Sequence, residues 1–223
     1  MPDLTLFLTV FLAVDFAALF LLLIFHLSKE AKHKKVLRYG EKAEKEVAEY
    51  LKKNFPKALL INNLYLEKGN AVTQIDHILL CPSGVFVIET KSHNGTIRTG
   101  GREWVQLWGE KVVHFHSPIL QNKSHCRIVE SILNAKRRKP LPVYGLVVFT
   151  SRKVSFTKRP EGILRLSELA PAIRKYGRGK RESLSRKTLF TMKKQILSHS
   201  VHKKSLITRH RKRVRSRDRN GSL

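Results

Sequence analysis

The stretch Gln74–Lys91, QIDHILLCPSGVFVIETK, constrains the fold more than any other part of the chain. Two apolar, β-rich runs flank the short Pro82-Ser83 turn and the glycine that follows it, a pattern typical of a β-hairpin. With Pro82-Ser83 as a two-residue loop, Cys81 faces Gly84, and the residue numbers of each cross-strand pair sum to 165. The sequence therefore predicts one specific register for this hairpin.

This register places two carboxylates opposite each other, Asp76 and Glu89, and strand alternation puts Lys91 on the face of Glu89. Directly opposed residues have Cβ atoms about 4.5–5.5 Å apart. Two carboxylates at that separation repel, so one is expected to be protonated unless a cation lies between them. A divalent ion bound by both, with the Lys91 ammonium beside it, relieves the conflict.

A purely structural alternative is a cross-strand ion pair of Asp76 with Lys91 that leaves Glu89 in solvent. The isoleucines beside these charges, Ile75 and Ile88, argue against it, because they predict surroundings too apolar for a surface patch.

The spacing of Asp76, Glu89 and Lys91 resembles the metal-dependent nuclease site of the restriction-endonuclease-like superfamily. The surrounding sequence resembles the nuclease-related domain family, known as NERD, over about residues 38–150. The resemblance is carried in order by Gly40-Glu41, Gln74-Ile75-Asp76-His77, Gly84–Lys91, Gly95-Thr96-Ile97, Trp104 and Ser117–Gln121. The chain departs from the family at Ser117-Pro118, where Asn-Pro is usual.

The resemblance implies an α/β fold with a restriction-endonuclease-like α-β-β-β-α-β core and an inserted hairpin. It also implies Mg²⁺ or Mn²⁺ held by Asp76, Glu89 and the carbonyl of Thr90, with Lys91 orienting a water or stabilising charge on the phosphate. Glu41 is a candidate site residue at the Gly-Glu position of the family, although a carboxylate there also suits the helix dipole. Gln121 is a candidate for holding Lys91 or a phosphate, with plain surface as the alternative.

Periodicity predicts the same order of elements. A helix is expected over Gly40–Asn54, a strand at Leu59–Ile61, a second hairpin around Gly109-Glu110, and a helix from Ser117 to about Ala135. Val143–Thr150 is a near-continuous apolar run, typical of a strand buried on both faces. Trp104 is expected in the core rather than in nucleic-acid stacking.

The N-terminal run Leu4–Leu27 is apolar apart from Asp15 and His26, and it is long enough to span a bilayer. Basic residues follow it, which predicts a single-pass anchor over 1–28, an external N-terminus and a cytoplasmic domain in the cell membrane. Residues 29–39 are expected to be a basic juxtamembrane linker. Asp15 is either a tolerated polar residue or a contact with another membrane helix.

The C-terminal part carries much of the net charge of +27: residues 174–223 hold 18 of the 44 Lys and Arg residues, against Glu182 and Asp218. An amphipathic helix is expected over Ser183–Leu197, with Leu184, Phe190 and Ile196-Leu197 as its apolar side. The final basic run is expected to be disordered. We therefore divide the chain into the anchor, the linker, a domain over 40–176 and a basic tail over 177–223 whose removal leaves the fold intact.

Two residue types restrict the chemistry further. Cys81 and Cys126 are the only cysteines, which argues against a disulfide framework and suits a reducing compartment. His114 and His116 share a strand face, with His93 and His125 elsewhere in the sequence, but without a cysteine or carboxylate at suitable spacing a transition-metal site is disfavoured. His77 is expected to have a structural role.

The sequence thus predicts a membrane-anchored, metal-dependent nuclease-like protein that hydrolyses phosphodiesters, with DNA favoured over RNA. The alternative is a non-catalytic membrane tether whose basic segments bind nucleic acid or anionic lipid. The sequence does not determine the oligomeric state.

Overall fold

The computed structural model describes residues 4–68, 71–135, 140–177, 183–202 and 205–209; the side chains of 4–15, 17, 18, 32, 33, 68 and 71 lie outside that description. The chain divides into two units, Met1–Lys42 and Ala43–Leu223, each of which is described by itself.

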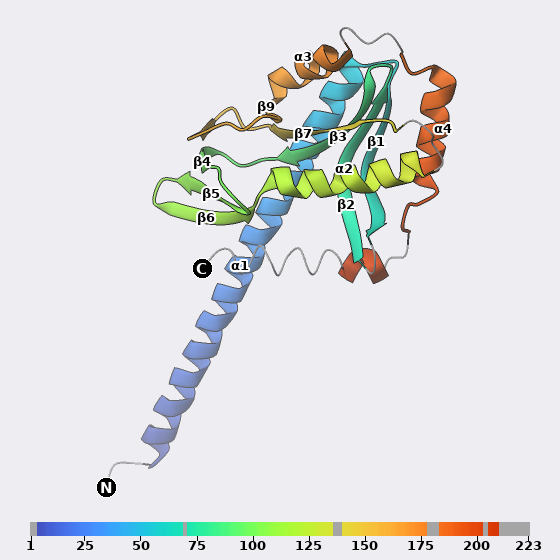
Figure 1. Ribbon diagram of the computed structural model, residues 1–223. Coiled ribbons are helices and arrows are strands. Elements are labelled where there is room, and N and C mark those ends of the chain that lie inside the picture. The colour runs from blue at the N-terminus through green and yellow to red at the C-terminus, as the bar shows by residue number, and fades with distance from the viewer. Residues whose placement is uncertain (1–3, 69–70, 136–139, 178–182, 203–204, 210–223) are drawn as a thin grey trace. The chain divides into compact units, whose positions relative to one another are not determined.

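Both helices and strands make up the second unit (Figure 1). The helices are α1 (Leu4–Asn54, which begins in the first unit), α2 (Pro118–Asn134), α3 (Leu166–Gly177) and α4 (Arg186–Leu197). The strands are β1 (Leu59–Lys68), β2 (Ala71–Cys81), β3 (Gly84–Lys91), β4 (Gly95–Arg98), β5 (Glu103–Trp108), β6 (Lys111–His116), β7 (Val143–Phe149), β8 (Val154–Phe156) and β9 (Ile163–Arg165). Strands β1 to β6 follow α1, β7 to β9 follow α2, and α3 and α4 come last. The fold is mixed α/β, and helix, three strands, insertion, helix and strand follow in the predicted order.

The larger sheet has the strand order β1-β2-β3-β7-β9. The predicted hairpin register is confirmed from Cys81↔Gly84 to His77↔Ile88. β7 lies parallel to β3, and its burial on both faces agrees with its apolar sequence. The strand expected at Leu59–Ile61 is longer than predicted, because residues 62–68 continue β1 alongside β2.

Helices cover both faces of this sheet. On one face α2 and α4 pack against Ile78, Leu80, Val85 and Val87 of the hairpin. On the other face α3 and the part of α1 after Lys42 pack against strand residues Leu79, Phe86, Ile88, Leu146 and Val148. Each strand of the hairpin thus buries alternate side chains in two separate cores.

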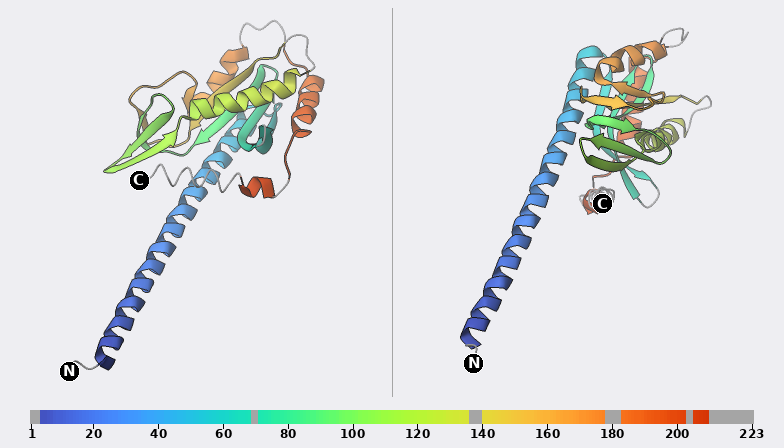
Figure 2. Two further views of the ribbon diagram at one scale, coloured as in Figure 1. Left: turned by 60° about the horizontal axis from the view of Figure 1, so that its bottom comes forward. Right: turned by 90° about the vertical axis from the view of Figure 1, so that its left-hand side faces the viewer.

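The smaller sheet has the order β6-β5-β4-β8, and it is joined to the larger one by a third apolar cluster. Trp104 belongs to that cluster and is 2% exposed, which confirms its predicted core position. In two views the β5–β6 hairpin lies at the outer end of this sheet, on the side away from α4 (Figures 1 and 2).

The C-terminal part corrects our prediction. α4 begins later than expected, after the N-cap Ser185, and it buries Leu189, Met192 and Ile196 in the main core. Phe190, predicted to lie on the apolar side, is exposed. The chain then bonds to the edge of β1 through the Val201 amide and the Tyr65 carbonyl (2.8 Å). Residues 183–201 are therefore part of the fold, whereas the final basic run after residue 209 lies outside the described residues.

The N-terminal part also differs from prediction. The expected linker 29–39 is helical and continuous with α1. Among the residues that were described, no helix has both the length and the apolar character needed to cross a membrane, so the predicted anchor is not supported. The side chain of Asp15 lies outside the described part, and the orientation and location of the protein stay predictions from the sequence.

Candidate functional site

The predicted carboxylates lie where β2 and β3 separate. Pairing between these strands stops at His77 and Ile88, one residue short of Asp76 and Glu89. On the other side of β2, Asp76 also lacks a pair, because Asn63 of β1 has a positive φ of 54° at the point where the register would oppose them. Asparagine tolerates this conformation better than most residues. The regular sheet is thus interrupted at Asp76.

The Thr90 amide of β3 donates to a side chain of β2: Asp76 Oδ2 accepts it at 2.8 Å. The pKa of Asp76 is raised well above its usual value, first by burial and then by the negative charges of Glu89 and Glu44. Three carboxylates therefore act on one another here, and the proton on Asp76 is retained to an unusually high pH.

The pKa of Glu89 shifts in the opposite direction to that of Asp76. Burial alone would raise its pKa, but the charge of Lys91 and the contact with His125 lower the pKa to about 2. Lys91 Nζ donates to Glu89 Oε1 at 2.7 Å and to Gln121 Oε1 at 3.2 Å. The alternative of an Asp76–Lys91 pair with a solvated Glu89 is wrong, because Glu89 is 3% exposed and is itself the partner of Lys91.

Gln121 lies in the first turns of α2, as predicted from the Ser117 cap, whose hydroxyl accepts the Leu120 amide at 3.5 Å. Asn122 fixes this helix end to the sheet, since its Nδ2 donates to the carbonyls of Val87 (3.0 Å) and Leu146 (2.9 Å). Family resemblance alone indicated Gln121 as a site residue. The side-chain amide of Asn122 anchors the start of α2 to the sheet.

His125 is a site residue that sequence reasoning missed. It lies one turn after Gln121, so both side chains emerge on the same face of α2. Its Nδ1 lies 3.4 Å from Glu89 Oε2, and its Nε2 lies 3.0 Å from Thr73 Oγ1. The i, i+4 spacing from Gln121 is the signal that would have found it.

A glutamate of α1 other than the predicted Glu41 also acts on Asp76. Glu44 lies close enough to raise the pKa of Asp76. Glu41, the predicted contributor, lies in the first unit and is exposed, and its role stays a prediction. Glu44 lies one turn before the buried Val47 on α1, a spacing that could have indicated it from the sequence.

The residues present fit a hard divalent ion. Within the part of the chain that the structure describes, the buried Thr90 Oγ1 has no hydrogen-bond partner, and Glu89 Oε2 has only the 3.4 Å contact with His125 Nδ1. Orphaned buried polar atoms are rare and point to a ligand. The described residues contain no cluster of three or more His, Cys, Asp and Glu side chains arranged to hold a metal. Two carboxylates with open positions suit Mg²⁺, which keeps several waters and is bound by one or two carboxylates.

The other histidines do not form a metal site in the described structure. His114 Nδ1 lies 3.0 Å from Glu103 Oε2, and the His93 ring stacks on Phe115 at 4.2 Å. His77 is buried against Asn62 Oδ1 (2.8 Å), and burial lowers its pKa to about 4. These contacts agree with the structural role predicted for His77.

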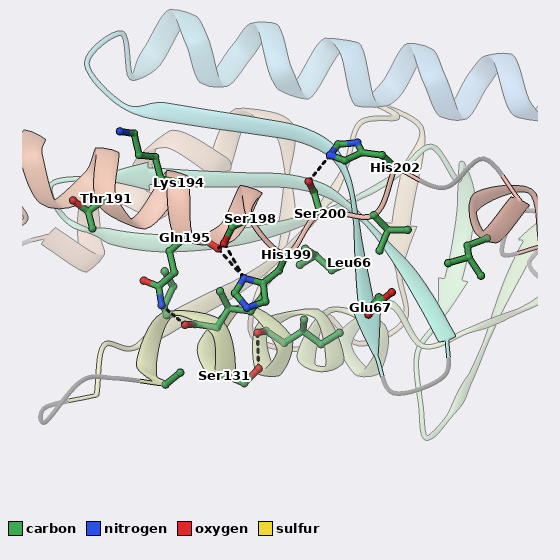
Figure 3. A pocket seen from close by; sticks show the side chains of 16 residues that line it. Leu66, Glu67, Ser131, Thr191, Lys194, Gln195, Ser198, His199, Ser200 and His202 are labelled. Carbon is green, nitrogen blue, oxygen red and sulfur yellow. Dashed lines mark hydrogen bonds between the residues drawn. The ribbon is translucent and has the colours of Figure 1, made fainter.

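A groove of about 1220 Å³ lies elsewhere, between α2, α4 and the end of β1 (Figure 3). Its lining contains none of the carboxylate-site residues. Figure 3 shows His199 and His202 on its border, where His202 Nε2 lies 2.7 Å from Ser200 Oγ. The chemistry suggested by the sequence is therefore not located in this hollow.

Comparison with known proteins identifies the family of the chain. An uncharacterized Bacillus anthracis protein is 30% identical over 146 residues, which is 61% of this chain and 66% of the relative's length. No solved structure matches. The model of the nuclease-related domain, NERD, matches residues 39–150, which contain every residue of the carboxylate site. Because that match covers half of the sequence, the chain belongs to the nuclease-related domain family.

Proposed function

We propose that the protein hydrolyses phosphodiester bonds of nucleic acid at the Asp76–Glu89–Lys91 site, with Mg²⁺ or Mn²⁺ as the cofactor. The observation that carries the proposal is the contrast between two neighbouring buried carboxylates: the pKa of Asp76 is raised, whereas the pKa of Glu89 is lowered to about 2. Strongly perturbed groups of this kind cluster at functional sites.

Asp76 and Glu89 are the proposed metal ligands, with the Thr90 carbonyl as a third. The Thr90 amide already lies 2.8 Å from the Asp76 carboxylate, so the backbone of β3 is next to this side chain. When bound, the ion polarises the scissile phosphate and lowers the pKa of an attacking water. Glu44 is a proposed partner for a water near Asp76.

Lys91 is the proposed group that orients the water or stabilises charge on the phosphate. Its ammonium is held by Glu89 and by Gln121, which belong to different elements. A cation fixed in this way needs little reorganisation as charge develops. The succession of elements around the site supports a restriction-endonuclease-like core, the finer fold that we propose.

A non-catalytic role is the second candidate, because the formal charge of +27 favours any polyanion. In that case the chain would bind nucleic acid or anionic lipid without cleaving it. DNA as the preferred nucleic acid, and any attachment to lipid, are proposals that rest on sequence alone.

Thermal melts and cleavage assays with four variants test the enzymatic role. Asp76→Asn and Glu89→Gln should abolish cleavage and reduce the rise in Tm that Mg²⁺ or Mn²⁺ gives the wild type, because a ligand stabilises only the form that binds it. Lys91→Ala should keep the metal-induced rise but lose cleavage by roughly 10²–10³-fold.

Glu103→Gln is the matched control, since this carboxylate bonds to His114 outside the site. It should change neither readout. A wild-type Tm that does not respond to either metal would refute the metal-dependent mechanism, and nucleic-acid binding without cleavage would favour the second candidate.

A further inference from the structure

The two tryptophans of the chain have opposite environments. Trp104 is 2% exposed, whereas Trp108 is 58% exposed. Trp108 ends β5 and pairs with Lys111 across the hairpin, and the Lys111 Nζ lies 5.8 Å from the centroid of the indole. The tip therefore presents a large aromatic surface beside a positive charge.

Side-chain hydrogen bonds connect β5 to the turn that follows β3, the strand that carries Lys91. Gln106, on the same face as Trp108, donates to Asn94 O (2.8 Å) and Asn94 Oδ1 (2.9 Å). The next residue, Gly95, has φ +72°, and a Cβ there would lie 3.3 Å from the Trp108 Cβ. Four residues span at most about 14 Å, so Gly95 cannot be farther than that from Lys91.

The charge around the smaller sheet indicates what this surface binds. Residues 92–116 and 151–158 contain six basic side chains and two acidic ones. An exposed indole with basic neighbours is the combination that proteins use for unpaired nucleotides: bases stack on the ring, and cations neutralise the phosphates.

We propose that Trp108 and Lys111 bind unpaired nucleotides of the nucleic acid whose phosphodiester enters the carboxylate site. A duplex hides the faces of its bases except at its ends, so single-stranded segments or strand ends should be preferred. The inference deepens the proposed function, on which it rests, by naming single-stranded nucleic acid as the substrate class.

Fluorescence tests the contact directly. The full chain with Trp104→Phe keeps Trp108 as its sole tryptophan. In EDTA, an oligothymidylate longer than about 16 nucleotides should quench this fluorescence. A blunt duplex of equal length and vesicles with anionic headgroups should quench it much less.

Anisotropy of a labelled oligothymidylate gives a second readout in chains that keep Trp104. Trp108→Ala should weaken binding roughly five- to 150-fold, the range expected for one stacked base. Lys111→Ala should weaken binding and reduce its salt dependence. Val112→Ala is the matched control, because Val112 is 52% exposed at the same tip but pairs with Leu107 on the opposite face.

Equal affinities of the Trp108→Ala, Val112→Ala and wild-type chains would overturn the proposal, as would quenching by vesicles or duplex alone. Asp76→Asn separates this inference from the proposed function. If that variant and the wild type both bind oligothymidylate through Trp108 but neither chain cleaves, the enzymatic proposal fails and the binding surface stands. If the wild type cleaves but oligothymidylate does not quench Trp108, the binding surface fails and the enzymatic proposal stands.

Discussion

The two ends of the β2–β3 hairpin differ in what their side chains do. Near the turn the pairing is regular, and Ile78, Leu80, Val85 and Val87 are completely buried. At the open end the pairing stops before Asp76, and buried polar atoms lie among charges. One hairpin thus contains an apolar half with regular pairing and a half in which buried polar and charged groups gather.

Helix α2 follows the same division. Its first turns direct Gln121, Asn122 and His125 toward the open end, whereas its later residues Val129 and Leu133 join the apolar core. α4 adds only apolar side chains to that core, and Leu184, just before it, bonds to the Pro82 carbonyl at the turn (3.0 Å). The apolar core and the charged groups therefore lie at different ends of the sheet, so variants should affect the stability of the fold and the properties of the site separately.

The largest effect is expected at the apolar half. Ile196→Ala should lower the free energy of unfolding by about 2–5 kcal/mol, because Ile196 is completely buried between α4 and the sheet. Urea unfolding measures the change. Phe190→Ala, on the exposed side of the same helix, should change it by less than about 0.5 kcal/mol. A chain ending at Gly177 should fail to fold, and a folded product would show that α4 is dispensable.

A smaller loss is expected where the two halves meet. Asn122→Ala removes the hydrogen bonds to the carbonyls of Val87 and Leu146, which should cost about 1–3 kcal/mol. The measurement is again urea unfolding, with Lys123→Ala, an exposed neighbour, as the control. Equal stabilities of the two variants would mean that these bonds do not hold α2.

Glu89→Gln should destabilise the metal-free protein at neutral pH. The folded-state pKa of Glu89 is about 2, against its usual 4.5, so its ionised form contributes stability above pH 4.5 that is lost as pH falls toward 2. The gap between wild type and variant should therefore close over that window in EDTA. A gap independent of pH would show that packing, not charge, is responsible.

Asp76→Asn should have the opposite sign and the smallest effect. Because the pKa of Asp76 is raised, the wild type loses stability as pH rises above the usual 3.8 and through the raised value. Asparagine cannot ionise but can still accept the Thr90 amide, so the variant should be slightly more stable at neutral pH and equal to wild type in acid. Denaturation in EDTA across pH tests this. Destabilisation of Asp76→Asn at neutral pH would contradict this prediction.

Much of the core could be predicted because its signals are local. Alternating apolar residues around Pro82-Ser83 determine the hairpin register, and the apolar run from Val143 predicts a strand buried on both faces. The family pattern then indicated Asp76, Glu89, Lys91 and Gln121, and the structure brings Lys91 together with both Glu89 and Gln121.

The errors arose where a segment's partner is distant in sequence. Residues 183–201 were assigned to a removable tail, although an amphipathic helix was expected there. Leu189, Met192 and Ile196 of that helix pack in one core with strand residues about a hundred positions earlier. The sequence assigned no site role to His125, whereas α2 places it beside Glu89 and Thr73.

The sequence by itself determined the hairpin, its register and the types of side chain at its open end, because period and turn chemistry act over a few residues. Only the tertiary structure decided that the pKa values of Asp76 and Glu89 shift in opposite directions. Both are buried carboxylates, and the difference comes from their neighbours: Glu44 lies near Asp76, whereas Lys91 and His125 lie against Glu89. Those neighbours come from different helices and strands, and their distances exist only once the chain has folded.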